Sequence, residues 1–353
     1  MAYDARWEDY QRLSLRFARS LDGSDPAAAL RAFATFGRRF AQNRDSLPQS
    51  DEDRAFHLVA DATVLIDYEL PFAETDARAE ELIHKASVLL DEAISLDAHC
   101  HDAVRMQSAA QNPSFETYYN FLRDHADEVR AQCEEARERV EDAPGEAGDR
   151  ALLGKSIAMR PYYRWLATMA DKALVCGRNR EAISLCEQLL ALDPIDGSDV
   201  RFTCALAYAK LEDDHGLDAL ARRCRDTGVA HGSNDAWLLL SQAALAHKRR
   251  DFSAARARIG DIINLYPHAA ATLVRQRELP DGVFSRIVVR PFSEDELIVA
   301  ASEGTVLLQE GRDRRGRGAF GAWVADAATE LARPEERDEV EEAARDVASG
   351  GMR

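Results

Sequence analysis

The sequence predicts an all-α fold built from antiparallel helix pairs. Apolar residues recur at helical spacing from residue 6 to residue 348, and several of the turns between the predicted helices are short. Short turns make consecutive helices antiparallel neighbours. Aromatic residues form only 7% of the 353 residues and prolines number 11, which is low for a sandwich or barrel of many short strands.

In the first part of the chain, helices are expected at about 6–20, 26–42, 52–68, 75–96 and 115–140. The apolar stripes of the first two consist of Leu13, Phe17 and Leu21, and of Leu30, Phe33, Phe36, Gly37 and Phe40. Asp25 is expected to cap the second helix, with Pro26 in its first position. Thr75 is expected to begin the fourth. Residues 1–141 therefore read as an N-terminal helical region of divergent repeats.

A break in this pattern follows at residues 142–149, where one proline and two glycines predict a linker or hinge. Further helices are expected at about 150–176, 179–192, 198–212, 214–227, 234–249, 252–266, 294–310, 319–331 and 334–348. The stretch 267–293 is less regular. Its segment 286–290 resembles a strand, but a single strand has no sheet to join, so an extended packing segment is expected. Residues 271–353 are predicted to form a helical capping region.

Internal repetition is the most informative feature of the sequence. The 34 residues from Tyr163 to Asp196 carry large residues at Leu166, Met169 and Leu189, small ones at Ala170, Ala182 and Cys186, a turn at Gly177 and a stop at Pro194. Residues 236–269 repeat this pattern with Ala243, Phe252, Ala255, Ile259, Ile262 and Pro267. A looser unit at 197–230 has Cys204 at a small position, Gly216 near the usual alanine and Gly228 in place of the proline.

With these units, the chain resembles the tetratricopeptide-repeat (TPR) superfamily, as a divergent bacterial helical-repeat protein, over about 150–270. Residues 85–97 also resemble the second helix of such a repeat. The resemblance implies a right-handed superhelical array of antiparallel helix pairs, a TPR-like α-solenoid. It also implies a cytoplasmic adaptor or scaffold whose inner groove binds a segment of another protein.

The resemblance further indicates which residues would face the groove. These are Arg164, Ala167, Asp171, Leu174 and Val175 in the first unit, Ser198, Arg201, Ala205, Tyr208 and Ala209 in the second, and Trp237, Leu240, Ala244, His247 and Lys248 in the third. The partner-binding candidates are Arg164, Asp171, Arg201, Tyr208, Trp237 and His247. Guanidinium and phenol groups suit a partner's carboxylates and backbone. The alternative is that Leu174, Val175 and Trp237 pack against neighbouring helices.

Motifs for catalysis or cofactor binding are weak, and no enzyme, cofactor or metal site is predicted. Residues 149–156 approach a phosphate-binding loop, but Asp149 stands where that loop needs glycine. His99, Cys100 and His101 are the densest group of metal-ligand types, yet neighbours on a helix point about 100° apart and cannot share one ion. The alternative function is an α-helical enzyme or a regulatory ligand-binding protein that uses the groove as its pocket.

The charge and the cysteines limit the partners and the compartment. A net charge of −17 argues against nucleic acid, and the compact basic run 312–318 is interpreted as a loop between helices. The sequence contains no run of about 18 apolar residues, so no membrane-spanning helix is expected. Six widely spaced cysteines, among them Cys176, Cys186 and Cys204 in apolar helical patterns, predict free thiols in a reducing cytoplasm. Self-assembly through exposed helices at either end, giving a homo-oligomer, is a third hypothesis.

Overall fold

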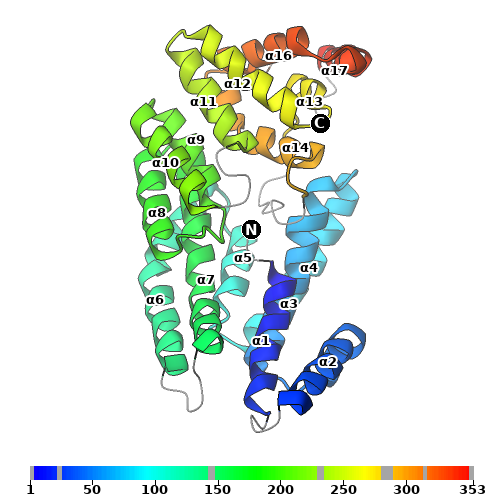
Figure 1. Ribbon diagram of the computed structural model, residues 1–353, viewed down its shortest axis with the longest axis vertical. Coiled ribbons are helices and arrows are strands. Elements are labelled where there is room, and N and C mark those ends of the chain that lie inside the picture. Colours follow the sequence, from blue (N-terminus) through cyan, green and yellow to red (C-terminus); the bar gives the residue numbers. More distant parts are fainter. Residues whose placement is uncertain are drawn as a thin grey trace. The chain divides into compact units, whose positions relative to one another are not determined.

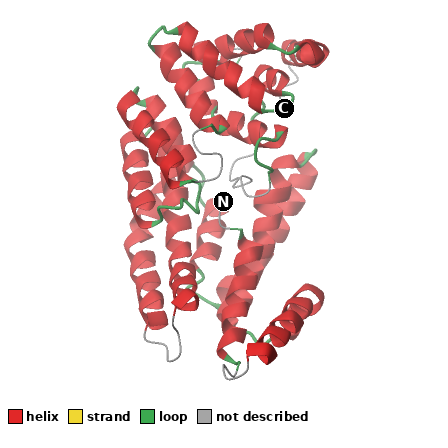
Figure 2. Cartoon of the chain, in the orientation of Figure 1, coloured by secondary structure: helices red, strands yellow, loops and turns green. Residues whose placement is uncertain are grey.

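The protein is helical throughout the part of the chain that the structure describes. A computed structural model describes residues 4–21, 26–141, 148–228, 234–279, 289–312 and 316–349. Seventeen α-helices and no strand occur in these ranges, which confirms the all-α prediction (Figures 1 and 2). None of these helices combines the length and the apolar character that crossing a membrane requires. The chain divides into an N-terminal unit, Tyr3–Leu166, and a C-terminal unit, Ala167–Arg353.

In the described residues, the N-terminal unit contains six α-helices and the first part of a seventh. They are α1 (Ala5–Arg19), α2 (Pro26–Asn43), α3 (Asp51–Thr63), α4 (Asp76–Leu96), α5 (His101–Gln111), α6 (Phe115–Glu141) and the first part of α7 (Gly148–Val175). α3 packs on α1, α4 and α5, and buries Phe56 and Val59 against Ala86 and Leu90. Thr75 caps α4 as predicted, because its side chain accepts a hydrogen bond from Arg78 N.

An aromatic cluster joins α2 to α1. Phe17 stacks on Phe36 at a ring distance of 4.8 Å and meets Phe33 edge-on at 5.4 Å. Leu30 does not join this stripe and is 74% exposed, so its assignment to the buried face was wrong. The physical reason is that α1 ends at Arg19, and Leu30 lies beyond the last aromatic pair.

The C-terminal unit contains consecutive helix pairs followed by a further helical group. Its helices are α8 (Asn179–Leu192), α9 (Val200–Lys210), α10 (Asp214–Thr227), α11 (Ala236–Lys248), α12 (Phe252–Leu265), α13 (Ala269–Arg275), α14 (Glu294–Glu303), α15 (Thr305–Leu308), α16 (Ala319–Leu331) and α17 (Arg337–Ala348). α9 packs on α8, α10 and α11, and α11 packs on α12.

Small residues bring these helices together as the repeat pattern predicted. Cys186, Cys204, Ala243 and Ala255 are each 0% exposed. The turn before α8 uses Gly177 at a φ of +75°, a conformation that costs glycine little. Phe252 departs from the predicted pattern because 48% of it is exposed.

Some predictions concern residues that the structure does not describe, and others concern the ends of helices. Asp25, residues 142–147 of the predicted linker and residues 286–288 of the strand-like segment lie outside the described residues. α7 already begins at Gly148. The two compact units divide between Leu166 and Ala167, within the range of α7. The helix expected at 294–310 is two helices, α14 and α15, which meet at Gly304.

Candidate functional site

Trp237, a predicted groove residue, is buried in the C-terminal unit. It is 1% exposed, its ring stacks on Phe202 at 3.9 Å, and its Nε1 donates to Glu303 Oε2 at 2.6 Å. The prediction that Trp237 is accessible to a partner was therefore wrong, and the alternative that it packs against neighbouring helices is confirmed. Glu303 is the last residue of α14, so this hydrogen bond shows that the end of α14 covers Trp237.

The same segment also contacts residues further along α9 and α11. Lys210 Nζ of α9 donates to Val306 O at 3.2 Å and to Glu310 Oε1 at 2.7 Å. Lys248 Nζ of α11 lies 2.9 Å from Glu310 Oε2. Gly304 lies so near α11 that a Cβ at that position would be 2.5 Å from Leu240 Cδ2. The chain's own residues 303–310 thus occupy the face expected to receive a partner.

His247, the other candidate on α11, lies against α16. Its half-buried ring contacts Phe320 at 5.3 Å and Trp323 at 5.1 Å. Burial lowers the pKa of this imidazole below its usual value. His247 is therefore part of an aromatic contact between helices.

Arg201 is buried against acidic residues at the N-terminus of α9, the helix to which it belongs. It is 3% exposed, and its Nη1 donates to Asp196 Oδ2 at 2.8 Å and to Asp199 Oδ1 at 2.6 Å. Burial raises the pKa of Asp196 to about 6, against the opposing effect of Arg201. The expected groove exposure of Arg201 was wrong, because these carboxylates just before and at the N-cap of α9 draw its guanidinium inward.

Tyr208 of α9 contacts both α8 and α10. It is 9% exposed, and its hydroxyl donates to Glu187 Oε1 on α8 at 3.1 Å. Its ring covers Gly216 of α10, where a Cβ would lie 2.2 Å from Tyr208 Cε1. The exposure expected of Tyr208 was therefore wrong, and its ring explains why Gly216 departs from the usual alanine.

The remaining candidate of the C-terminal unit, Asp171, keeps a partly accessible side chain. Its carboxylate is 29% exposed and lies 3.2 Å from Lys172 Nζ. Leu174 is buried, as the packing alternative expected, whereas Val175 is 40% exposed. No binding surface joins Asp171 to Arg201 or Trp237, because the last two are inside the core.

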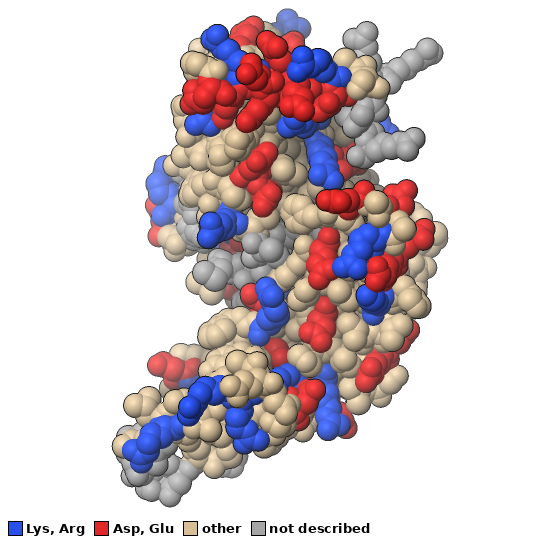
Figure 3. Space-filling view, turned by 90° about the vertical axis from the view of Figure 1, so that its right-hand side faces the viewer, with Lys and Arg blue, Asp and Glu red and all other residues tan. Residues whose placement is uncertain are grey.

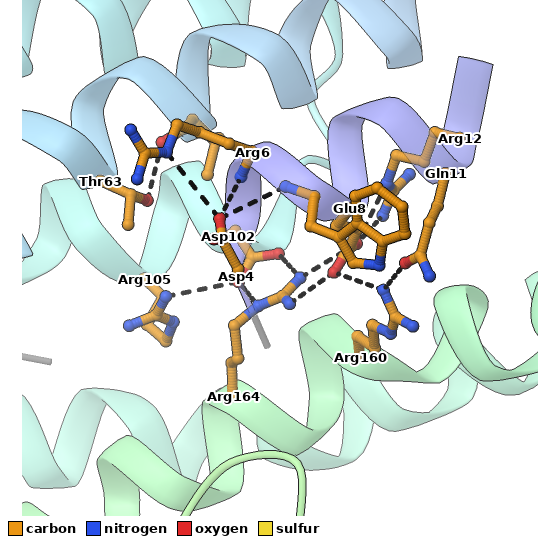
Figure 4. Close-up of polar contacts among 12 residues, drawn as sticks. Asp4, Arg6, Glu8, Gln11, Arg12, Thr63, Asp102, Arg105, Arg160 and Arg164 are labelled. Carbon is orange, nitrogen blue, oxygen red and sulfur yellow. Dashed lines mark hydrogen bonds and ion pairs between the residues drawn. The ribbon is translucent and has the colours of Figure 1, made fainter. Parts of the chain in front are cut away.

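Arg164 lies in the N-terminal unit at the centre of a charged cluster (Figure 4). Its Nε and Nη2 donate to the two oxygens of Asp102 at 2.7 and 2.5 Å, and its Nη1 donates to Glu8 Oε2 at 2.8 Å. Arg12 and Arg160 also donate to Glu8. The cluster therefore connects α1, α5 and α7.

Both carboxylates of this cluster are fully enclosed. Glu8 is 0% exposed and Asp102 is 2% exposed. Burial alone would raise the pKa of Glu8, but the charges of Arg164, Arg12 and Arg160 outweigh it and lower the pKa below 4.5. The same balance, led by Arg164, lowers the pKa of Asp102. Arg164 is thus a structural cross-link between helices, and its role in binding a partner stays a prediction.

A pocket of about 340 Å³ opens beside this cluster and contains the His99–His101 motif. Arg12, Phe56, Cys100, His101, Asp102 and Cys133 are among the residues that line it. Burial raises the pKa of Cys100 to about 12 and that of Cys133 to about 11, so both thiols stay protonated at neutral pH. Burial also lowers the pKa of His101, which favours the neutral imidazole. The pocket offers hydrogen bonds and two guanidinium groups, those of Arg12 and Arg139, but no activated thiol.

The other sequence motifs have local structural roles. Residues 149–156 lie inside α7 and form no loop. No group of three or more His, Cys, Asp or Glu side chains is placed to hold a metal ion in the described ranges. In the basic run, residues 313–315 lie outside the description, and Arg317 donates to Val274 O of α13. All six cysteines are free thiols, and all but Cys176 are buried.

The outer face of α2 is a charged surface that was not predicted from the sequence. α2 contains three arginines and no acidic residue. Arg31 and Arg38 are exposed, and neither has an ion-pair partner within the described part of the chain. Figure 3 shows basic side chains along this protruding helix. The absence of Asp and Glu from 26–43 was the signal that could have identified it.

No family model matches the sequence, and no curated protein matches it.

Proposed function

We propose that this chain is a TPR-like, right-handed superhelical scaffold that binds an acidic segment of another protein on the outer face of α2. The single observation that carries the proposal is a pair of exposed arginines, Arg31 and Arg38, on a helix without acidic residues; neither forms an ion pair with any residue that the structure describes. This surface replaces the predicted groove, because three of the six groove candidates, Arg201, Tyr208 and Trp237, are buried in the C-terminal unit.

The spacing on this face supports a helical partner. Ala27, Arg31, Ala34, Arg38 and Ala41 follow one another at intervals of four, three, four and three residues, and all are exposed. This is the spacing of a helix–helix seam. The three alanines allow a second helix to approach closely, while the arginines can form bidentate pairs with carboxylates.

The character of the face favours a protein over a membrane or a nucleic acid. A membrane-bound amphipathic helix inserts several large apolar side chains. Of the four on α2, Phe33, Phe36 and Phe40 face α1, and only Leu30 is exposed. The exposed stripe also lacks an aromatic ring on which a base could stack. The chain has a net charge of −17, so apart from this face it is repelled by an anionic membrane surface and by a nucleic acid.

The proposal includes a cytoplasmic location and no catalytic role. The raised thiol pKa of Cys100 and Cys133 supports the second point, because the pocket of the N-terminal unit then contains no thiolate nucleophile. Buried free cysteines are typical of reducing compartments.

Charge reversal on α2 tests the proposal. Tagged wild type, Arg31→Glu/Arg38→Glu and a control, Arg222→Glu/Arg225→Glu, are expressed in the native cell and the bound proteins are identified by mass spectrometry. The control reverses two exposed arginines on α10 and makes the same change in net charge. An acidic protein retained by wild type and control but lost from the α2 variant supports the proposal. Identical sets of bound proteins in all three, with equal amounts of the untagged native copy of this chain, would overturn it.

A second candidate function is regulation by a small ligand, and the pocket of about 340 Å³ favours it. Native mass spectrometry of the protein purified from its own cells tests this idea. A small molecule should accompany the wild-type chain. It should be absent from Ala136→Leu, which adds bulk to the pocket lining without changing a charge. The absence of any bound molecule from gently purified wild type would count against this function.

A further inference from the structure

The helix α17 offers an acidic surface that matches the α2 face. α17 contains five acidic residues and two arginines. Val340 and Ala343 are buried, whereas Asp338, Glu341 and Glu342 are exposed on the opposite side. Figure 3 shows acidic side chains gathered on the C-terminal unit. The outward face of α17 is therefore a helical surface of net negative charge.

The dimensions of the two faces are compatible. Arg31 and Arg38 are seven residues apart, which is about 10.5 Å along a helix. The carboxylates from Asp338 to Glu342 extend over about 6 Å, and the long arginine side chains can span the difference. Ala27, Ala34 and Ala41 leave room for a helix to lie between the guanidinium groups.

We infer that the outer face of α2 binds α17 of a second copy of this chain, which gives head-to-tail self-association. The inference rests on the proposed function of α2 as a docking face and names its partner. Copies with a net charge of −17 repel one another in most orientations. When α2 of one copy faces α17 of another, opposite charges come together and the two copies attract each other. Electrostatics therefore favours this orientation over the others.

The contact is small, and this sets the expected strength. α17 has 12 residues, so the paired helices share about 18 Å of length. Such a contact falls at the weak, transient end of protein interfaces. Its attraction comes from exposed charges, which salt screens strongly. Self-association should therefore be weak and should become at least about tenfold weaker between 50 and 500 mM salt.

Paired charge reversals on the full-length chain provide the test. Sedimentation velocity at rising concentration in 50 mM salt should show the wild type growing beyond a monomer. Arg31→Glu/Arg38→Glu and Glu341→Lys/Glu342→Lys should each stay monomeric. An equimolar mixture of these two variants should associate, and a chain carrying all four substitutions should regain self-association. Arg222→Glu/Arg225→Glu should behave as wild type. Circular dichroism of each variant checks that the helices are retained.

Three results would overturn the inference. They are a wild type that stays monomeric at low salt, association that survives both reversals, and a four-substitution chain that stays monomeric. If Arg31→Glu/Arg38→Glu blocks association while Glu341→Lys/Glu342→Lys does not, α2 docks elsewhere and the assignment to α17 is wrong. Failure of self-association leaves the proposed function standing if the α2 variant still loses a bound acidic protein in the cell.

Discussion

At the residue scale, Glu8 compensates the charges of three arginines in the N-terminal unit. One carboxylate that is 0% exposed receives hydrogen bonds from Arg12, Arg160 and Arg164. Guanidinium groups cannot lose their charge by shifting a proton, so they depend on this anion for compensation. Glu8 therefore fixes the positions of α1 and α7 within the unit.

Replacing Glu8 by glutamine should be strongly destabilising. The change keeps the shape but removes a charge shared by three buried or half-buried arginines, and breaking such a pair typically costs about 3–5 kcal/mol. Urea unfolding should show this loss. The control is Glu81→Gln on α4, where an exposed glutamate pairs with Arg78 and Lys85 and should matter little. Similar effects of both substitutions would contradict the role assigned to Glu8.

The same residue predicts a pH dependence. The folded-state pKa of Glu8 is lowered from 4.5, so its contribution to stability is fully present above pH 4.5 and is lost as the pH falls through the folded-state value. The difference in unfolding free energy between wild type and Glu8→Gln should be constant from pH 7 to about pH 5 and should shrink below that range. A difference that grows on acidification would have the wrong sign for a depressed pKa.

At the element scale, the segment formed by α14 and α15 closes the face of α9 and α11. Gly304 permits this approach, because a Cβ there would meet Leu240 Cδ2 at 2.5 Å and Ala300 O at 2.9 Å. The polar contacts of Glu303 and Glu310 then fix the segment along the two helices. Glycine at this junction is thus a requirement of the fold.

Two glycine substitutions test this claim in opposite directions. Gly304→Ala should destabilise the protein by about 1–3 kcal/mol, the usual cost of overpacking. Gly260→Ala, inside α12 with nothing within 4 Å of its added Cβ, should stabilise by about 0.5–1 kcal/mol through helix propensity. Thermal unfolding of both variants gives the comparison. A stabilising Gly304→Ala would show that the segment does not press on α11.

The helices themselves could be predicted from the sequence because amphipathic periodicity is local. The expected ranges 179–192 and 319–331 agree residue for residue with α8 and α16. α13 was missed because Ala269–Val274 are buried on every side, and a helix without a polar face has no period to detect. α5, which four residues separate from α4, was also missed.

The site was harder to predict because it depends on long-range contacts. Repeat positions indicate which side of α11 faces inward, but they do not reveal that Glu303 will cover Trp237. Nor does the spacing of Arg201 show that Asp196 and Asp199 will turn it inward. The α2 face is different, because its lack of acidic residues and its four-three spacing are both visible in the sequence.

At the scale of the whole molecule, the two compact units each contain an apolar core of their own. Phe56, Val59 and Leu90 lie in the core of the N-terminal unit, whereas Cys204, Ile259 and Leu307 are buried in the C-terminal unit. Units with separate cores can open separately, and such openings are resolved by hydrogen exchange. Stability should therefore vary by unit, and one unfolding free energy need not describe the whole chain.

Hydrogen exchange of the two destabilised variants tests this independence. Glu8→Gln should accelerate exchange of backbone amides in α1 and α5, whose contacts it breaks, while α9 and α12 keep their protection. Gly304→Ala should do the reverse, because Leu240 lies in the C-terminal unit. The two patterns together exclude a general loss of stability, since each variant is the control for the other. Uniform acceleration across both units in both variants would instead show a single cooperative fold, in which the loss of Glu8 is felt as far as α12.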